Sequence, residues 1–102
     1  MNEYRNMNFV RTDSFDRVLE RIREKDHKVA YRIEQAIEEL KWDLMLNIPT
    51  FKARTSLRMK KVEETYGKNM YSIRVSKKIR LLFQLKKNNV TWITPYYGHY
   101  DD

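Results

Sequence analysis

The strongest constraint on the fold of this chain is a strict alternation of apolar and polar residues in its last third. Apolar side chains recur at every second position over residues 71–75 and again over residues 79–85. A period of two is typical of β-strands with one buried face, and the intervening Ser76-Lys77-Lys78 is typical of a tight turn. The pattern therefore predicts a β-hairpin.

The register of this hairpin follows from the same pattern. A three-residue turn places apolar residues opposite one another along one whole face, which supports the pairing. The pairs are Tyr71 with Phe83, Ile73 with Leu81 and Val75 with Ile79. The other face then has Arg74 directly across from Arg80. Like charges in this position destabilise a sheet, and a bound anion of phosphate size would compensate for them.

A third strand is expected after a second turn at Lys87-Asn88-Asn89, because asparagine tolerates the left-handed backbone of tight turns. Two registers are compatible with the pattern. Both put Val90, Trp92, Thr94 and Tyr96 on the apolar face, and Thr91, Ile93 and Tyr97 beside Arg80. A strand that continues regularly also brings His99 beside Arg80, whereas a bulge at Gly98 would not.

The first half of the chain predicts a helix hairpin. Thr12-Asp13-Ser14 supplies N-cap candidates, and apolar residues then recur at helical spacing to about residue 25. Asp26-His27 breaks the pattern, which resumes from about residue 28 to residue 46.

Further strands are expected near residues 7–11 and over residues 57–62, with a loop at 64–69. The expected order is β-α-α-β-β-β in a single α+β domain spanning residues 1–102. The helix hairpin would pack on one face of a small, mainly antiparallel sheet. The opposite face, which carries Arg74 and Arg80, would remain partly open.

The distribution of charge along the chain indicates what kind of partner the protein binds. The formal net charge is +7, yet the segment from Lys52 to Lys87 holds twelve lysines and arginines and only two glutamates. Such asymmetry favours a polyanionic partner, nucleic acid first, over the alternative of a generally solvated basic surface.

Other classes are not supported by the composition. The chain has no cysteine, which favours a reducing cytoplasm, and no apolar run of membrane-spanning length. No metal-ligand cluster and no glycine-rich phosphate loop is present, so neither a metal nor another cofactor is expected.

The chain resembles the RelE/ParE superfamily of bacterial toxin–antitoxin systems in its order of elements and in three segments. These are YSIRV at 71–75, IRLLFQL at 79–85 and GHYDD at 98–102. The resemblance extends over nearly the whole chain from Asn8, although the helical half matches only in type. In the RelE branch this fold binds mRNA in the ribosomal A site and cleaves it. In the ParE branch it inhibits DNA gyrase and lacks the ribonuclease residues. Either branch implies a cognate antitoxin.

The resemblance also assigns roles to individual residues. Arg80 matches the arginine that contacts the scissile phosphate, and Arg74 matches a basic strand position. His99 and Tyr100 resemble the His-Tyr end of the YoeB branch, where these residues serve acid and base roles. Tyr100 stands where RelE has a second arginine, and the sequence given ends at Asp102, before the tyrosine of many members. The general acid is therefore left unidentified.

Elementary chemistry is compatible with these roles. Attack of an RNA 2′-OH on its own phosphate needs a base, charge stabilisation and an acid. Guanidinium groups grip phosphate and keep their charge, and histidine is the side chain with an unperturbed pKa near neutrality. Candidate RNA-binding residues are Arg58, Lys60 and Lys61 in the basic segment before the hairpin, and Tyr97, whose ring can stack on a base.

The sequence thus favours a ribosome-dependent mRNA endoribonuclease that inhibits translation. Two alternatives stay open at this point. One is a ParE-like toxin that inhibits DNA gyrase without nuclease activity, and the other is an RNA- or protein-binding domain without catalysis. An adjacent His99-Tyr100 pair favours the nuclease, because a toxin that only binds its target does not need these residues.

Overall fold

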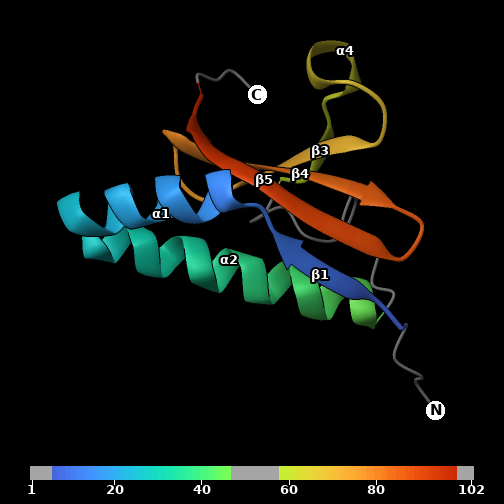
Figure 1. Ribbon diagram of the computed structural model, residues 1–102, viewed down its shortest axis with the longest axis horizontal. Helices are drawn as coiled ribbons and strands as arrows, with labels where there is room; N and C mark the ends of the chain where they lie inside the picture. Colours follow the sequence, from blue (N-terminus) through green and yellow to red (C-terminus); the bar gives the residue numbers. More distant parts are fainter. Residues whose placement is uncertain (1–5, 47–57, 99–102) are drawn as a thin grey trace.

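A five-stranded sheet with two long helices on one side organises the described part of the chain (Figure 1). The computed structural model describes residues 6–46 and 58–98. In chain order the elements are β1 (Asn8–Arg11), α1 (Asp13–Lys25), α2 (His27–Met45), β2 (Lys60–Lys61), α4 (Glu63–Tyr66), β3 (Met70–Arg74), β4 (Ile79–Lys86) and β5 (Asn89–Tyr97).

The strands follow the order β1-β5-β4-β3-β2 across the sheet. β1 is parallel to β5, and the other neighbouring strands are antiparallel. α1 and α2 pack as a hairpin against one face (Figure 1). The α+β fold predicted from the sequence, with its mainly antiparallel sheet, is confirmed. No helix within the described ranges is long and apolar enough to cross a membrane.

Two capping residues set the limits of the helices. Thr12 Oγ1 accepts a hydrogen bond from a first-turn N–H of α1 at 3.0 Å. The Asp26 N–H donates to Ile22 O at 2.7 Å and ends α1, while the Asp26 carboxylate accepts from two N–H groups of α2 at 3.1 and 3.3 Å. These bonds satisfy backbone groups that a helix end leaves without partners. The predicted break is therefore confirmed, with His27 as the first residue of α2.

The core lies between the helix hairpin and the sheet and is centred on three aromatic rings. The Trp92 ring lies 5.9 Å from that of Phe15 and 5.0 Å from that of Phe83, and all three side chains are fully buried. Burial of each such side chain contributes about 1.5–3 kcal/mol to stability. The stripe predicted for α2 consists of Val29, Ile33, Ala36, Ile37, Leu40 and Leu44. The last five are buried, whereas Val29 is half-buried and Ala30 is buried beside it.

An ionic cluster fastens α2 to β1 and α1. Both Nη atoms of Arg11 donate to the Glu34 carboxylate, and Arg23 Nη2 lies 3.3 Å from the same carboxylate. The hydrogen bond to Glu34 raises the pKa of Arg11 above its usual value, since it stabilises the charged form.

The β3–β4 hairpin has the predicted register. Tyr71 faces Phe83, Ile73 faces Leu81, and Arg74 faces Arg80. The turn is closed by a hydrogen bond of 2.9 Å from Val75 N to Ile79 O. Apolar pairing on one face thus fixed the alignment, as expected from the period of two.

The predicted side-chain directions in the second half of β5 are wrong. The β4–β5 ladder contains a bulge that leaves Ile93 without an opposite residue, so Phe83 pairs with Trp92 but Leu82 pairs with Thr94. A bulge reverses the alternation beyond it, because one extra residue shifts a period of two by half. Tyr96 therefore lies opposite Arg80, and Tyr97 lies opposite Ile79.

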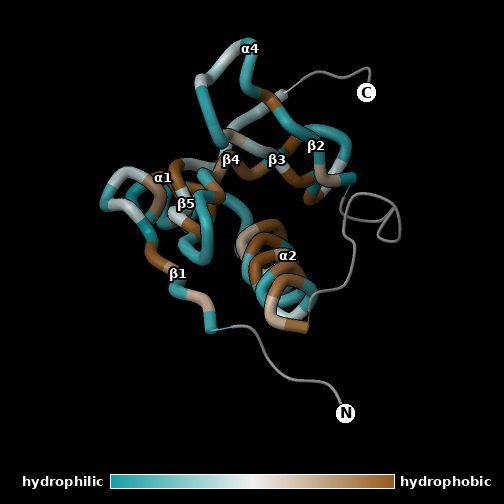
Figure 2. Tube along the Cα trace, turned by 90° about the vertical axis from the view of Figure 1, so that its right-hand side faces the viewer, coloured by the Kyte–Doolittle hydropathy of each residue, from teal (hydrophilic) through white to brown (hydrophobic). Residues whose placement is uncertain are grey.

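The sheet face opposite α1 and α2 is not open as expected. Ser72, Arg80 and Leu82 on this face are all buried. Figure 2, which looks along α2, shows α2 on one side of β3 and β4 and α4 on the other. The sequence predicted a loop where α4 forms, and a one-turn helix over the sheet was not foreseen. β2 is also shorter than expected, with two paired residues.

Candidate nucleic-acid interface

The candidate site lies on the sheet face that α1 and α2 leave uncovered, here termed the arginine face. Strand pairing defines it, because residues directly opposite one another in a sheet point to the same side. Arg74, Arg80 and Tyr96 form one row across β3, β4 and β5. The next row consists of Lys60, Ser72, Leu82 and Thr94.

Arg80 occupies the centre of the arginine face. It belongs to β4, the middle strand of the sheet, and pairs with neighbours on both sides. Only 5% of its surface is exposed. An electrostatic contact made in such a water-poor position is stronger than the same contact at the surface. Arg80 can therefore bind an anion tightly, provided that the anion reaches it.

Arg74 lies at the edge of this site and is half-buried. Its Nε donates to Ser76 O at 3.3 Å, so the side chain turns toward the β3–β4 turn. Arg74 also borders a groove of about 630 Å³ beside α2, which Tyr31 and Glu38 help to line. It is thus more accessible than Arg80 and can be reached from the sheet edge.

The structure separates the three basic residues predicted before the hairpin. Lys60 pairs with Ser72 and so belongs to the arginine face. Lys61 pairs with Tyr71 instead, and its Nζ lies 5.9 Å from the Tyr71 ring centroid. Arg58 is exposed, precedes β2 and has a positive φ of 45°. Of these three, strand pairing brings only Lys60 into register with the arginine face.

The aromatic residue beside Arg80 is Tyr96, and not Tyr97 as predicted. Tyr97 is 70% exposed and borders a cavity of about 230 Å³ on the helix side, next to Lys25 and Val29. In the structure, the buried residues of β5 change phase between Trp92 and Pro95, which is what a bulge produces.

Tyr66 is a second aromatic residue that sequence reasoning missed. It ends α4, and its ring centroid lies 5.9 Å from that of Tyr96. Two tyrosine rings thus extend from the position next to Arg80 over the arginine face. The contact joins residues 30 positions apart in the sequence, so no local pattern indicates it.

The two predicted proton carriers, His99 and Tyr100, lie outside the described residues. The described chain ends at Gly98, whose N–H donates to Lys78 O at 3.0 Å. Pairing between β5 and the start of β4 therefore continues two residues beyond Tyr96.

The arrangement of charges and rings is suited to a phosphodiester with an adjacent base. Guanidinium groups donate paired hydrogen bonds to phosphate oxygens, and aromatic rings stack on bases. Within residues 6–46 and 58–98, no group of three or more His, Cys, Asp or Glu side chains is placed to hold a metal ion.

No protein-family model and no curated protein sequence matches this chain. Several solved structures do match the chain. A YoeB/ParE toxin from Agrobacterium tumefaciens has a TM-score of 0.68 at 15% identity, covering 91% of this chain and 100% of that chain. YafQ from E. coli strain BL21(DE3) has a TM-score of 0.70 at 10% identity, with coverages of 91% and 94%. A chain of the heterotetrameric YoeB-YefM toxin-antitoxin complex from Staphylococcus aureus has a TM-score of 0.65 at 14% identity, with coverages of 94% and 100%.

These matches combine high coverage with low identity, and such a combination establishes the fold. The RelE-like arrangement expected from the sequence is confirmed on this independent ground. The chain has the fold of the YoeB/ParE toxin from Agrobacterium tumefaciens and of YafQ.

Proposed function

We propose that this chain is the toxin of a toxin–antitoxin module and acts as an mRNA endoribonuclease that stops translation. The observation that carries the proposal is the row of Arg74, Arg80 and Tyr96 across the centre of the sheet. Arg74 and Arg80 are like charges directly opposite one another, which is unfavourable in a sheet, and a bound phosphate would compensate for this repulsion. Likeness to toxin structures supports the same function.

The proposed reaction is an in-line displacement at phosphorus. The 2′-oxygen of the RNA attacks the neighbouring phosphate while its proton passes to a base, and the bond from phosphorus to the 5′-oxygen breaks. That oxygen receives a proton from an acid, leaving a 2′,3′-cyclic phosphate and a 5′-hydroxyl. Arg80 and Arg74 stabilise the charge that develops on the phosphate oxygens. His99 and Tyr100 are the proposed proton carriers.

Substrate access follows from the burial of Arg80. A phosphate contacts its guanidinium only if side chains above the arginine face move, on the side of the sheet where α4 lies (Figure 2). Lys60 lies in the adjacent row and guides the RNA backbone toward the site. Arg58 and Lys61 are proposed to contact RNA farther from the cleavage point, outside that row.

The proposed target is mRNA in the ribosomal A site, which places the reaction in the cytoplasm. The proposed partner is a cognate antitoxin with an acidic segment, which the basic charge of residues 52–87 would attract. A toxin–antitoxin heterotetramer of matching fold, YoeB-YefM, is known from Staphylococcus aureus.

The test compares Arg80→Lys with wild type and with Arg21→Lys, an exposed arginine of α1. Arg80→Lys keeps the charge but loses the planar guanidinium fork, so we expect cleavage of mRNA on the ribosome to fall by about 100-fold. Arg21→Lys should cleave like wild type. After the reaction on the ribosome, the mRNA is extracted and primer extension measures how much of it has been cleaved.

Incorporation of labelled methionine and thymidine after induction separates the nuclease from the gyrase inhibitor. We expect methionine incorporation to stop first. Early loss of thymidine incorporation with intact mRNA would overturn the nuclease proposal and favour inhibition of DNA gyrase.

A further inference from the structure

Tyr66 holds an unusual position for a large aromatic side chain. Its ring is 45% exposed, yet it lies over the arginine face and contacts Tyr96 at a ring angle of 56°. α4 contains no buried residue, so Tyr66 is not an anchor for a hydrophobic core. Figure 1 shows α4 standing away from the sheet on the side opposite α1 and α2.

Backbone hydrogen bonds fix α4 without help from the Tyr66 ring. Val62 N donates to Met70 O at 2.9 Å, and Asn69 N donates to Glu63 Oε2 at 2.6 Å. Gly67 closes the segment with φ 105° and ψ −179°, a conformation that is essentially restricted to glycine. The segment therefore presents the ring at a defined place, and the ring itself remains available for another contact.

We propose that Tyr66 and Tyr96 form a stacking platform for the RNA base next to the phosphate held at Arg80. The inference rests on the proposed function and adds substrate-binding residues to it. Tyr96 is opposite Arg80 in the ladder, so one strand spacing of about 4.8 Å separates their backbones. Unpaired bases of single-stranded RNA bind proteins chiefly by such stacking, and the ring accepts any base.

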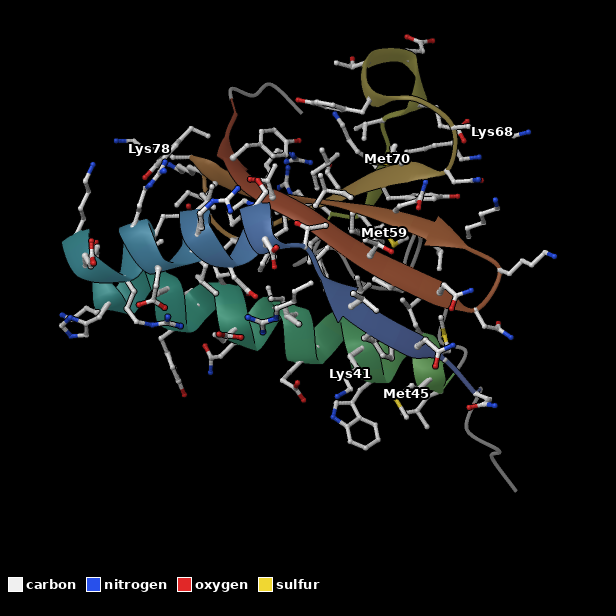
Figure 3. The ribbon with its side chains drawn as sticks, in the orientation of Figure 1. Lys41, Met45, Met59, Lys68, Met70 and Lys78 are labelled. Carbon is white, nitrogen blue, oxygen red and sulfur yellow. The ribbon has the colours of Figure 1, made fainter. Side chains whose placement is uncertain are left out.

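Charge near the platform favours RNA over a protein surface as the occupant. Lys60 lies in the row beside Arg80, and exposed Lys68 lies in the turn that leads from α4 to β3 (Figure 3). Of the two acidic residues of α4, Glu63 is half-buried and accepts a hydrogen bond from the Asn69 N–H, and Glu64 is exposed. Cations beside an exposed ring bind the backbone phosphates on either side of a stacked base.

The experiment measures binding of a short single-stranded RNA with 2′-deoxyribose at the cleavage position, so that no cleavage occurs. Fluorescence anisotropy gives Kd for wild type and variants. Tyr66→Ala should weaken binding on the order of 10-fold, and Tyr66→Phe should stay within about 2-fold, because stacking needs the ring and not the hydroxyl. Trp42→Ala is the control, since Trp42 is an aromatic residue of α2 with a similar exposure of 47% and does not line the groove beside Arg74.

An abasic nucleotide placed in turn at each position of the RNA separates stacking from a structural role. For wild type, an abasic nucleotide at one position next to the blocked cleavage site should weaken binding on the order of 10-fold. For Tyr66→Ala, the same abasic nucleotide should cause no further loss of affinity. If abasic RNA weakens both proteins equally at every position, Tyr66 does not stack on a base and the inference is wrong.

Arg80→Lys in the same assay distinguishes this failure from failure of the proposed function. Binding that depends on Arg80 but not on the Tyr66–abasic pair overturns the stacking platform alone. If binding is also independent of Arg80, or if the wild type does not bind the RNA at all, both the stacking platform and the proposed function are overturned. Loss of antitoxin affinity in Tyr66→Ala with unchanged RNA affinity would assign the platform to a protein partner and refute the inference.

Discussion

Arg80 combines a permanent positive charge with burial in the middle of a sheet. Lysine and arginine are almost never fully buried unless they have a partner, because transfer of a charge out of water is costly. Alternation in β4 explains how the chain reaches this state. Ile79 and Leu81 face the helices, and Arg80 between them must face the other side. The guanidinium of Arg80 is therefore carried to the arginine face by the alternation of β4.

The first prediction compares the two arginines in stability. Arg80→Ala should lower the free energy of unfolding by about 1–3 kcal/mol, because it removes packed methylene groups from a buried site. Arg74→Ala should change it by less than about 0.5 kcal/mol, as is usual for partly exposed positions. Urea unfolding measures both.

Arg80→Met is the control for that comparison. Methionine fills most of the volume of the arginine stem, so it should restore part of the stability lost in the alanine variant. Equal stabilities of wild type and Arg80→Ala would mean that the Arg80 side chain is not packed as the structure describes it.

At the scale of elements, β5 is the strand whose sequence was hardest to interpret. Val90 and Trp92 are buried two positions apart, as in a regular strand, but the next buried residue is Pro95, which lies at an odd spacing from Trp92. Proline is accepted there because β1 ends opposite Trp92, which leaves that edge of β5 without a neighbouring strand in the described chain. The sequence predicts alternation as far as Tyr97 and allows a bulge at Gly98, whereas the extra residue lies at Ile93 and exchanges the places of Tyr96 and Tyr97.

Other elements were predictable because local chemistry determines them. Apolar spacing and capping residues define α1 and α2, and apolar pairs define the β3–β4 hairpin. α4 was not predictable, since it has no apolar face and no side-chain cap. Its position depends on the hydrogen bonds from Val62 N to Met70 O and from Asn69 N to the Glu63 carboxylate, neither of which leaves a local apolar pattern.

The second prediction concerns Thr12, which joins the start of α1 to the bulge in β5. Thr12 Oγ1 caps α1 and also donates to Ile93 O at 2.9 Å, while Thr12 N donates to Trp92 O at 3.0 Å. Thr12→Val keeps the shape but loses both hydroxyl bonds, so the free energy of unfolding should fall by about 1–2 kcal/mol.

Thr12→Ser is the matched control, because serine retains the hydroxyl. It should stay close to wild type in urea unfolding, within about 0.5 kcal/mol. If serine and valine destabilise the protein equally, the methyl group and not the hydroxyl explains the role of Thr12.

The whole molecule divides into two sides with different electrostatics. On the helix side, acidic and basic residues compensate one another, as in the pairs Arg23 with Glu20 and Lys41 with Glu38. On the arginine face, Arg74, Arg80 and Lys60 lie in adjacent rows that contain no acidic residue. The net charge of +7 attracts polyanions to the protein as a whole, and within the described residues the arginine face offers them rows of cations without an acidic residue.

The third prediction uses salt to locate that contact. Each phosphate neutralised by a protein cation contributes about 0.7 to the slope of log Kd against log salt concentration for single-stranded nucleic acid. Arg74→Gln should therefore reduce the slope for the uncleavable RNA by about 0.7, whereas Arg21→Gln on α1 should leave it unchanged. Both variants lose one charge, so net charge alone predicts equal effects. Tyr66→Ala should weaken binding at every salt concentration without altering the slope, because stacking releases no counterions. Equal slopes for the two arginine variants would place the RNA elsewhere on the surface.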